Sequence, residues 1–98
     1  MLRTMISDTP FEQTWVLQGR LCGQWAVDLQ RRWKAARNER QGRKCIVNLE
    51  DVTYMDSDGQ TLLQQMLDEG CQLVASRVYT KYVLESLKAD RSYNHVDR

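Results

Sequence analysis

The residues of this chain whose types and spacing could support chemistry gather in one segment, here called the Ser57 turn, which consists of Asp56, Ser57, Asp58, Gly59 and Gln60. It follows an apolar run, Cys45–Leu49, and leads into an amphipathic run, Gln60–Glu69, so a buried strand should end and a helix begin nearby. Ser57 and Gln60 have the spacing of a capping box, in which each side chain satisfies a free backbone N–H group. Free N–H groups at a helix start also favour anions, so Ser57 could carry a phosphate there.

A phosphate on Ser57 would change the charge of this turn strongly. It would add roughly −1.5 to −2 charges at pH 7. Because Asp56 and Asp58 flank the serine, the added charge would repel an acidic partner and would be poorly solvated against an apolar one. The turn therefore predicts either a phosphorylation-regulated surface or a helix cap alone.

Catalytic and metal-binding patterns have little support. His95 is the only histidine and lies near the end of the chain, so a Ser–His or Cys–His nucleophile lacks a positioned base. Cys22, Cys45 and Cys71 are widely spaced in apolar surroundings, which predicts reduced core thiols rather than disulfides or metal ligands. We expect no enzyme, no cofactor and no metal site.

Length and composition predict one small domain spanning residues 1–98. The 98 residues, 42% of them hydrophobic, suffice for one modest core, and the net charge of +1 indicates no general attraction to nucleic acid or membranes. There is no run of 18 apolar residues, and Met1–Pro10 carries polar residues throughout. We therefore expect neither a transmembrane helix nor a signal peptide, and a cytoplasmic protein.

Hydrophobic periodicity predicts alternating strands and helices. The expected strands are Thr14–Leu21, Cys45–Leu49 and Cys71–Ala75, and the expected helices are Gly23–Arg40, Gln60–Glu69 and Val78–Leu87. Strands joined through helices imply right-handed parallel crossovers and an α/β sheet flanked by helices. The core should cover about residues 14–88, with Cys45–Leu49 as a central strand buried on both faces. We expect frayed ends at residues 1–10 and 91–98.

Helical spacing also predicts which side chains face the core. In the first helix these are Trp25, Leu29, Trp33 and Ala36, with Ala26 beside them. In the last helix they are Val78, Tyr79, Tyr82, Val83 and Leu87.

Charge is distributed unevenly along the chain. Residues 31–44 contain one acidic residue among many basic ones, including Arg31, Arg37 and Arg40, whereas residues 48–70 contain acidic residues and no Lys or Arg. Such a basic face could steer an acidic partner. Only Trp33 lies among the basic residues, and its helical position assigns it to the core, so stacking on nucleic-acid bases is not expected.

Residues 47–59, with the sequence Val-Asn-Leu-Glu-Asp-Val-Thr-Tyr-Met-Asp-Ser-Asp-Gly, resemble the signature of the STAS domain, found in sulfate transporters and anti-sigma-factor antagonists. Leu17–Leu21 is similar to the Gly-Glu-Leu segment that ends an early strand in that family, and Gly70 precedes a strand as expected. The resemblance covers about residues 14–88 and is nearest to the bacterial antagonists. Asp58 stands where the family's turn has a second Ser or Thr.

The resemblance implies a small mixed, largely parallel sheet flanked by helices and a bacterial signalling role in transcription regulation. A partner kinase would phosphorylate Ser57, and residues 56–60 would dock on an anti-sigma partner. One alternative is a small STAS subunit that regulates the ATPase of an ABC transporter. Another is a receiver-like or nucleotide-binding regulator with Asp56 and Asp58 near Mg²⁺, although Thr14–Gly23 lacks the further acids that such a site needs.

Overall fold

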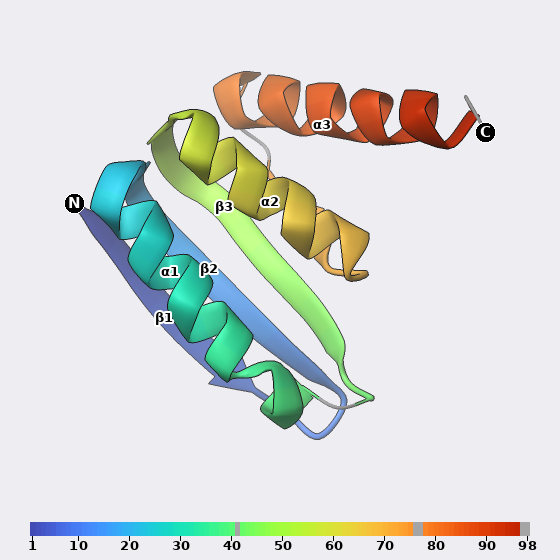
Figure 1. Cartoon of the computed structure of the whole chain (residues 1–98). Helices are drawn as coiled ribbons and strands as arrows, with labels where there is room; N and C mark the ends of the chain where they lie inside the picture. The colour runs from blue at the N-terminus through green and yellow to red at the C-terminus, as the bar shows by residue number, and fades with distance from the viewer. Residues whose placement is uncertain (41, 76–77, 97–98) are drawn as a thin grey trace.

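The computed structural model describes residues 1–40, 42–75 and 78–96, together with their side chains except at positions 38, 40, 78, 79 and 90–96 (Figure 1). The elements in chain order are β1 (Leu2–Asp8), β2 (Glu12–Leu21), α1 (Gly23–Ala35), the 3-10 helix η1 (Arg37–Arg40), β3 (Lys44–Met55), α2 (Ser57–Asp68), β4 (Gln72–Val74) and α3 (Val78–Val96).

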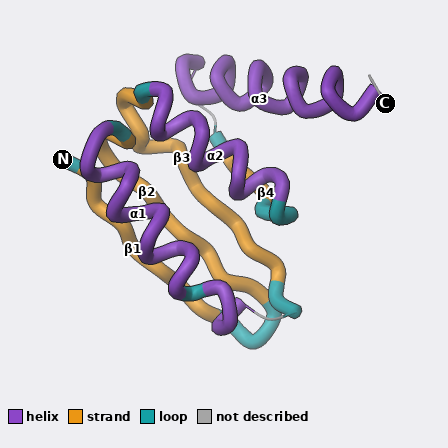
Figure 2. Tube along the Cα trace, viewed as in Figure 1, coloured by secondary structure: helices purple, strands orange, loops and turns teal. Residues whose placement is uncertain are grey.

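The strands form one mixed sheet in the order β1-β2-β3-β4. β1 is antiparallel to β2, while β2, β3 and β4 are parallel to one another. Because both parallel crossovers step across the sheet in the same direction and are right-handed, α1 and α2 lie on the same face, side by side (Figures 1 and 2). α3 packs against β3 and α2.

The core lies between the sheet and these helices. Its sheet side is built from alternate positions of β2 and β3, including Trp15, Leu17, Val47 and Leu49, and its helix side includes Leu29, Trp33, Leu62, Leu63 and Met66, all of them buried. The positions between them, such as Val16 and Ile46, are half-buried. The expectation that the central strand is buried on both faces is therefore wrong, because both crossover helices cover the same face.

The N-terminal segment differs from the frayed end that the sequence predicted. Leu2–Asp8 forms β1, which pairs with β2 along its whole length, from Leu2 opposite Gly19 to Asp8 opposite Gln13. This strand shows little alternation, because it lies at the sheet edge and only Leu2 and Thr4 are half-buried. At the other end, α3 continues beyond Leu87 to Val96, so residues 91–96 are helical rather than frayed.

Two aromatic residues expected in the core face outward. In α1 the buried face consists of Ala26, Leu29 and Trp33, and Trp25, which precedes this stripe, is 44% exposed. In α3, Val83, Leu84 and Leu87 are buried, whereas Tyr82 is 70% exposed. The expected inward positions Val78 and Tyr79 lie outside the described side chains.

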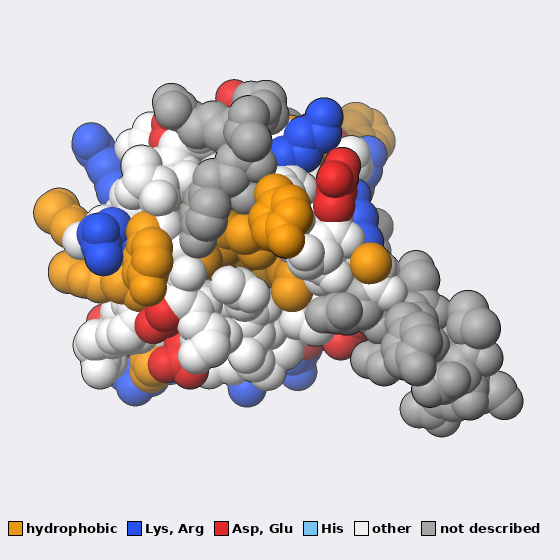
Figure 3. Space-filling view, turned by 90° about the horizontal axis from the view of Figure 1, so that it is seen from above, with side chains coloured by type: hydrophobic (Ala, Val, Ile, Leu, Met, Phe, Trp, Pro, Cys, Tyr) orange, Lys and Arg blue, Asp and Glu red, His pale blue; other side chains and the backbone are white. Residues whose placement is uncertain are grey.

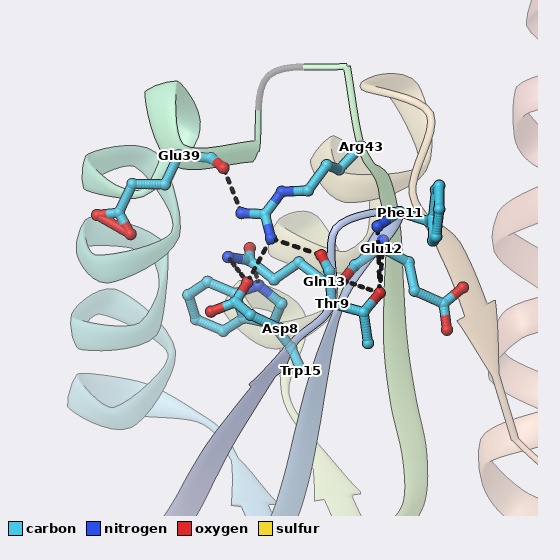
Figure 4. Close-up of polar contacts among 8 residues, drawn as sticks. All are labelled: Asp8, Thr9, Phe11, Glu12, Gln13, Trp15, Glu39 and Arg43. Carbon is cyan, nitrogen blue, oxygen red and sulfur yellow. Dashed lines mark hydrogen bonds and ion pairs between the residues drawn. The ribbon is translucent and has the colours of Figure 1, made fainter.

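A polar cluster joins the β1–β2 turn to the start of β3 (Figure 4). Arg43 Nη1 donates to Asp8 Oδ1 at 2.8 Å, and Arg43 Nη2 donates to the carbonyl of Glu39. The buried Gln13 donates from Nε2 to Asp8 at 3.0 Å and accepts from Trp15 Nε1 at 2.7 Å. The hydrogen bond from Gln13, followed by that from Arg43, lowers the pKa of Asp8. The cluster holds the end of the sheet opposite to the Ser57 turn.

Candidate functional site

The Ser57 turn lies directly after β3, at the carboxyl edge of the parallel strands. Asp56 has extended backbone angles, φ −94° and ψ −172°, and its Oδ1 accepts the backbone N–H of Gly59 at 2.8 Å. Asp56 is therefore the N-cap of α2, and its own carbonyl accepts the first helical hydrogen bond, from Gln60 N at 3.0 Å. The expected capping box of Ser57 and Gln60 is wrong. The N-cap is Asp56, one position earlier, and Ser57 is already the first helical residue.

The second carboxylate oxygen of Asp56 extends to the other crossover helix. Asp56 Oδ2 accepts the backbone N–H of Gly23, the first residue of α1, at 2.9 Å. The residue at the N-cap of α1, Cys22, makes no capping hydrogen bond with its side chain. The hydrogen bonds from Gly59 and then Gly23 stabilise the ionised form and lower the pKa of Asp56. One carboxylate thus holds the starts of two adjacent helices.

Gly59 fixes how closely α2 approaches the end of β2. A Cβ at this position would lie 2.2 Å from the carbonyl oxygen of Leu21. The same carbonyl accepts the backbone N–H of Asp56 at 3.4 Å. Only glycine leaves room for this contact, so the position of the turn against β2 depends on Gly59.

The remaining residues of the turn point to solvent or to the groove between the helices. Ser57 and Asp58 are exposed, and Gln60 is half-buried. Among the described residues, no hydrogen bond involves the Ser57 hydroxyl. Asp58 lines a cavity of about 130 Å³ between α1 and α2, together with Val27 of α1. The structure therefore brings all five predicted residues together, with Ser57 accessible.

Exposed hydrophobic residues lie at the same end of the molecule as this turn, and sequence reasoning missed them as site residues. Trp25 is 44% exposed in the first turn of α1, and Val27 is 39% exposed beside the α1–α2 cavity. Tyr54, at the end of β3, is 40% exposed, with the guanidinium of Arg20 4.6 Å from its ring centroid. Figure 3, which views the molecule from above, shows hydrophobic side chains with both basic and acidic side chains beside them on this face. One signal in the sequence could have revealed Tyr54: it lies between Val52 and Met55, which are buried, so its own side chain should face outward.

The predicted basic residues lie apart from the turn. Arg31 is in α1 and is 3.9 Å from Asp28, and Arg37, in η1 beyond the opposite end of α1, pairs with Glu69 at 2.9 Å. The side chain of Arg40 lies outside the described residues. Within the described part of the chain, no cluster of three or more His, Cys, Asp or Glu residues could hold a metal ion. None of the helices in residues 1–40, 42–75 and 78–96 has the length and apolar character needed to cross a bilayer.

Solved structures of other proteins share this architecture. An anti-sigma factor antagonist from Mycobacterium paratuberculosis superposes with a TM-score of 0.79 and 16% identity, covering 94% of this chain and 82% of the other. The anti-sigma factor antagonist SpoIIAA in its unphosphorylated form superposes with a TM-score of 0.62 and 18% identity, covering 93% of this chain and 98% of the other. No family model and no curated protein sequence matches the chain. The chain has the STAS-like fold that the resemblance of residues 47–59 predicted.

Proposed function

We propose that this protein is a non-enzymatic, cytoplasmic module of bacterial signalling that acts as an anti-sigma factor antagonist does, binding a protein partner through the Ser57 turn. Phosphorylation of Ser57 by that partner would end the interaction. The observation that carries the proposal is the exposed Ser57 hydroxyl at the first residue of α2, next to a capping carboxylate that makes the hydroxyl unnecessary for the helix.

The geometry of the helix start supports a reactive rather than a structural serine. A serine at the N-cap would use its oxygen to accept a backbone N–H group. Here Asp56 accepts those bonds, from Gly59 and Gly23. Ser57 can therefore gain a phosphate without losing a cap, and the backbone N–H groups of the first turn would favour the added charge.

The surroundings of Ser57 support a docking surface. Trp25, Val27 and Tyr54 present apolar area at the same end of the molecule, and binding energy concentrates at such aromatic residues. A phosphate on Ser57 would stand beside Asp56 and Asp58, raising the negative charge of the surface sharply. A partner packed on the apolar residues would then face a charge that it could not solvate. The farther basic residues Arg31 and Arg37 would affect the association rate through long-range attraction.

Partner capture and a phosphorylation assay test this proposal together. The tagged full chain is used for affinity capture from a lysate of its source organism, and mass spectrometry identifies the protein retained. We expect a serine kinase of the anti-sigma type, and with ATP it should transfer one phosphoryl group to the wild type and to Ser7→Ala. Ser7 is exposed in β1 and serves as the matched control. Ser57→Ala should accept none.

Other results would favour the alternatives. Capture of a transporter ATPase, without phosphoryl transfer, would assign the chain to transporter regulation. Acid-stable phosphate on Ser7→Ala and equally on Ser57→Ala would contradict the role given to Ser57. Capture of neither class, with an acid-labile phosphate on an aspartate, would favour a receiver-like regulator.

A further inference from the structure

Two of the three cysteines occupy matching positions on neighbouring strands. The β3–β4 register pairs Ile46 with Gln72 and Val47 with Leu73. Cys45 precedes Ile46 and Cys71 precedes Gln72, so the parallel register carries the two cysteines to adjacent places at the start of these strands. Side chains alternate along a strand, so both cysteines face the same side as the buried Val47 and Leu73.

Both cysteines line one cavity. It has a volume of about 290 Å³ and is bounded by Trp33 and by residues of the α1–β3 and α2–β4 connections. Cys45 is 8% exposed and Cys71 is 6% exposed, and neither forms a disulfide in the structure. The exposed Gly42 and Gly70 also line this cavity, so it reaches the surface. A small reagent can therefore approach thiols that are otherwise enclosed by the core.

We propose that Cys45 and Cys71 form a reversible dithiol–disulfide pair that responds to a peroxide or to a small-molecule disulfide. Neighbouring strands are about 4.7–4.9 Å apart, and the Cα atoms of disulfide-bonded cysteines are usually about 4.4–6.8 Å apart. The separation that the register imposes thus lies within the range that a disulfide needs. Cys71 lies directly before the first residue of β4.

The chemistry is a two-electron oxidation. With hydrogen peroxide, one thiolate attacks an oxygen, the O–O bond breaks, and a sulfenic acid forms as hydroxide leaves and takes up a proton as water. The second thiolate then attacks the sulfenic sulfur, forming the S–S bond and releasing a second hydroxide. Arg37, Arg43 and Lys44 line the same cavity, together with one acidic residue, Glu69, which pairs with Arg37. The thiolate is the reactive form of a cysteine, and basic side chains nearby favour it.

The bond would add a covalent link between the end of α2 and the start of β3. Cys71 follows α2 directly, and its backbone N–H donates to the carbonyl of Met66 in the last turns of that helix at 2.9 Å. Cys45 lies at the start of β3, opposite Gln13 of β2. A disulfide would therefore tie the end of α2 to the central strand. The inference does not depend on the function proposed for Ser57.

Cys22 provides the internal control. It is half-buried at the start of α1, near the Ser57 turn and at the other end of the sheet from Cys45. An oxidation that reflects only general thiol reactivity would include Cys22, whereas one directed by the fold would exclude it.

The experiment oxidises the purified full chain with a small excess of hydrogen peroxide, and separately with oxidised glutathione, and maps the products by alkylation and peptide mass spectrometry. We expect two of the three thiols to be lost, an intramolecular link between Cys45 and Cys71, and a free Cys22. Dithiothreitol should restore all three thiols. Cys22→Ala should behave as the wild type, and Cys45→Ala and Cys71→Ala should each form no internal link.

An alanine in the core can destabilise the fold, so a second control uses the wild-type protein, oxidised once in its native state and once in denaturant. Oxidation in denaturant should spread over all three pairings, whereas native oxidation should give one. A native product that links Cys22, consists of disulfide-bonded dimers, or carries separate sulfinic acids without a link would overturn the proposal.

Discussion

The carboxylate of Asp56 accepts the backbone N–H of Gly23 at 2.9 Å, across 33 positions of sequence, while it caps its own helix through Gly59 at 2.8 Å. The starts of α1 and α2 are thereby fixed relative to each other by one side chain. Ser57, the next residue, takes its position from this arrangement without contributing to it. The capping and the proposed phosphorylation are thus assigned to different residues.

This division of roles predicts unequal effects of two adjacent substitutions. Asp56→Ala removes the acceptor of two backbone N–H groups and should lower the melting temperature clearly. Ser57→Ala, at an exposed first helical position, should change the free energy of unfolding by no more than about 0.5 kcal/mol. Circular dichroism melts of both variants test this. A larger decrease in melting temperature for Ser57→Ala than for Asp56→Ala would show that Ser57 is the capping residue.

The lowered pKa of Asp56 predicts an acid-dependent loss of stability. In the folded protein its carboxylate stays ionised to lower pH than in the unfolded chain, because Gly59 and Gly23 donate to it. Its contribution to stability is therefore complete above the ordinary aspartate pKa of about 3.9 and is lost as the pH falls through the lower folded-state pKa.

The comparison of wild type with Asp56→Asn isolates this effect, because Asp8, whose pKa is also lowered, is unchanged in both proteins. The difference between their melting temperatures should be constant near neutral pH and shrink as the pH falls below about 4. Chemical denaturation at several pH values gives the same comparison at one temperature. A difference that is independent of pH would show that the ionised form of Asp56 is not what stabilises the turn.

The two faces of β3 predict different tolerance of a buried charge. Val47 is fully buried beneath the helices, whereas Ile46 points to the other, half-buried face. Val47→Asp should unfold the domain, since an unpaired carboxylate in this core costs more than so small a domain can spare. Ile46→Asp, one residue away, should remain folded with a lower melting temperature. Equal unfolding of both variants, measured by circular dichroism, would indicate that the second face is also enclosed.

The fold was predictable from the sequence where burial imposes a clear period. Trp15, Leu17 and Leu21 recur at strand spacing and lie in β2, and the stripe containing Leu29 and Trp33 marked α1. β3 was predicted only to Leu49, because the exposed Glu50 and Asp51 interrupt its apolar run at the point where its register with β2 shifts. The apolar pattern alone does not reveal such a bulge.

Features that depend on distant partners could not be predicted in this way. β1 is recognisable only through its pairing with β2, since its outer side chains are exposed. The role of Asp56 depends on Gly23, which lies in another crossover, so local spacing favoured Ser57 as the cap. The local structure at the Ser57 turn could nevertheless be predicted, because a strand end, an acidic turn and a helix start are adjacent in the sequence.

Asp58 is exposed beside Ser57, at a position where the family that the sequence resembles has Ser or Thr. If its carboxylate partly imitates a phosphate on the turn, partner affinity should rise with Asp58→Ser, fall further with Ser57→Asp, and change little with Ser57→Ala. The imitation should be incomplete, because a carboxylate supplies about one negative charge and a phosphate about −1.5 to −2. The competing explanation is that Asp58 only complements the dipole of α2, which is worth about 0.3–1 kcal/mol of stability. Calorimetric titration of the captured partner with Asp58→Ser separates them, because unchanged affinity together with a small drop in melting temperature would leave Asp58 as a helix-start charge alone.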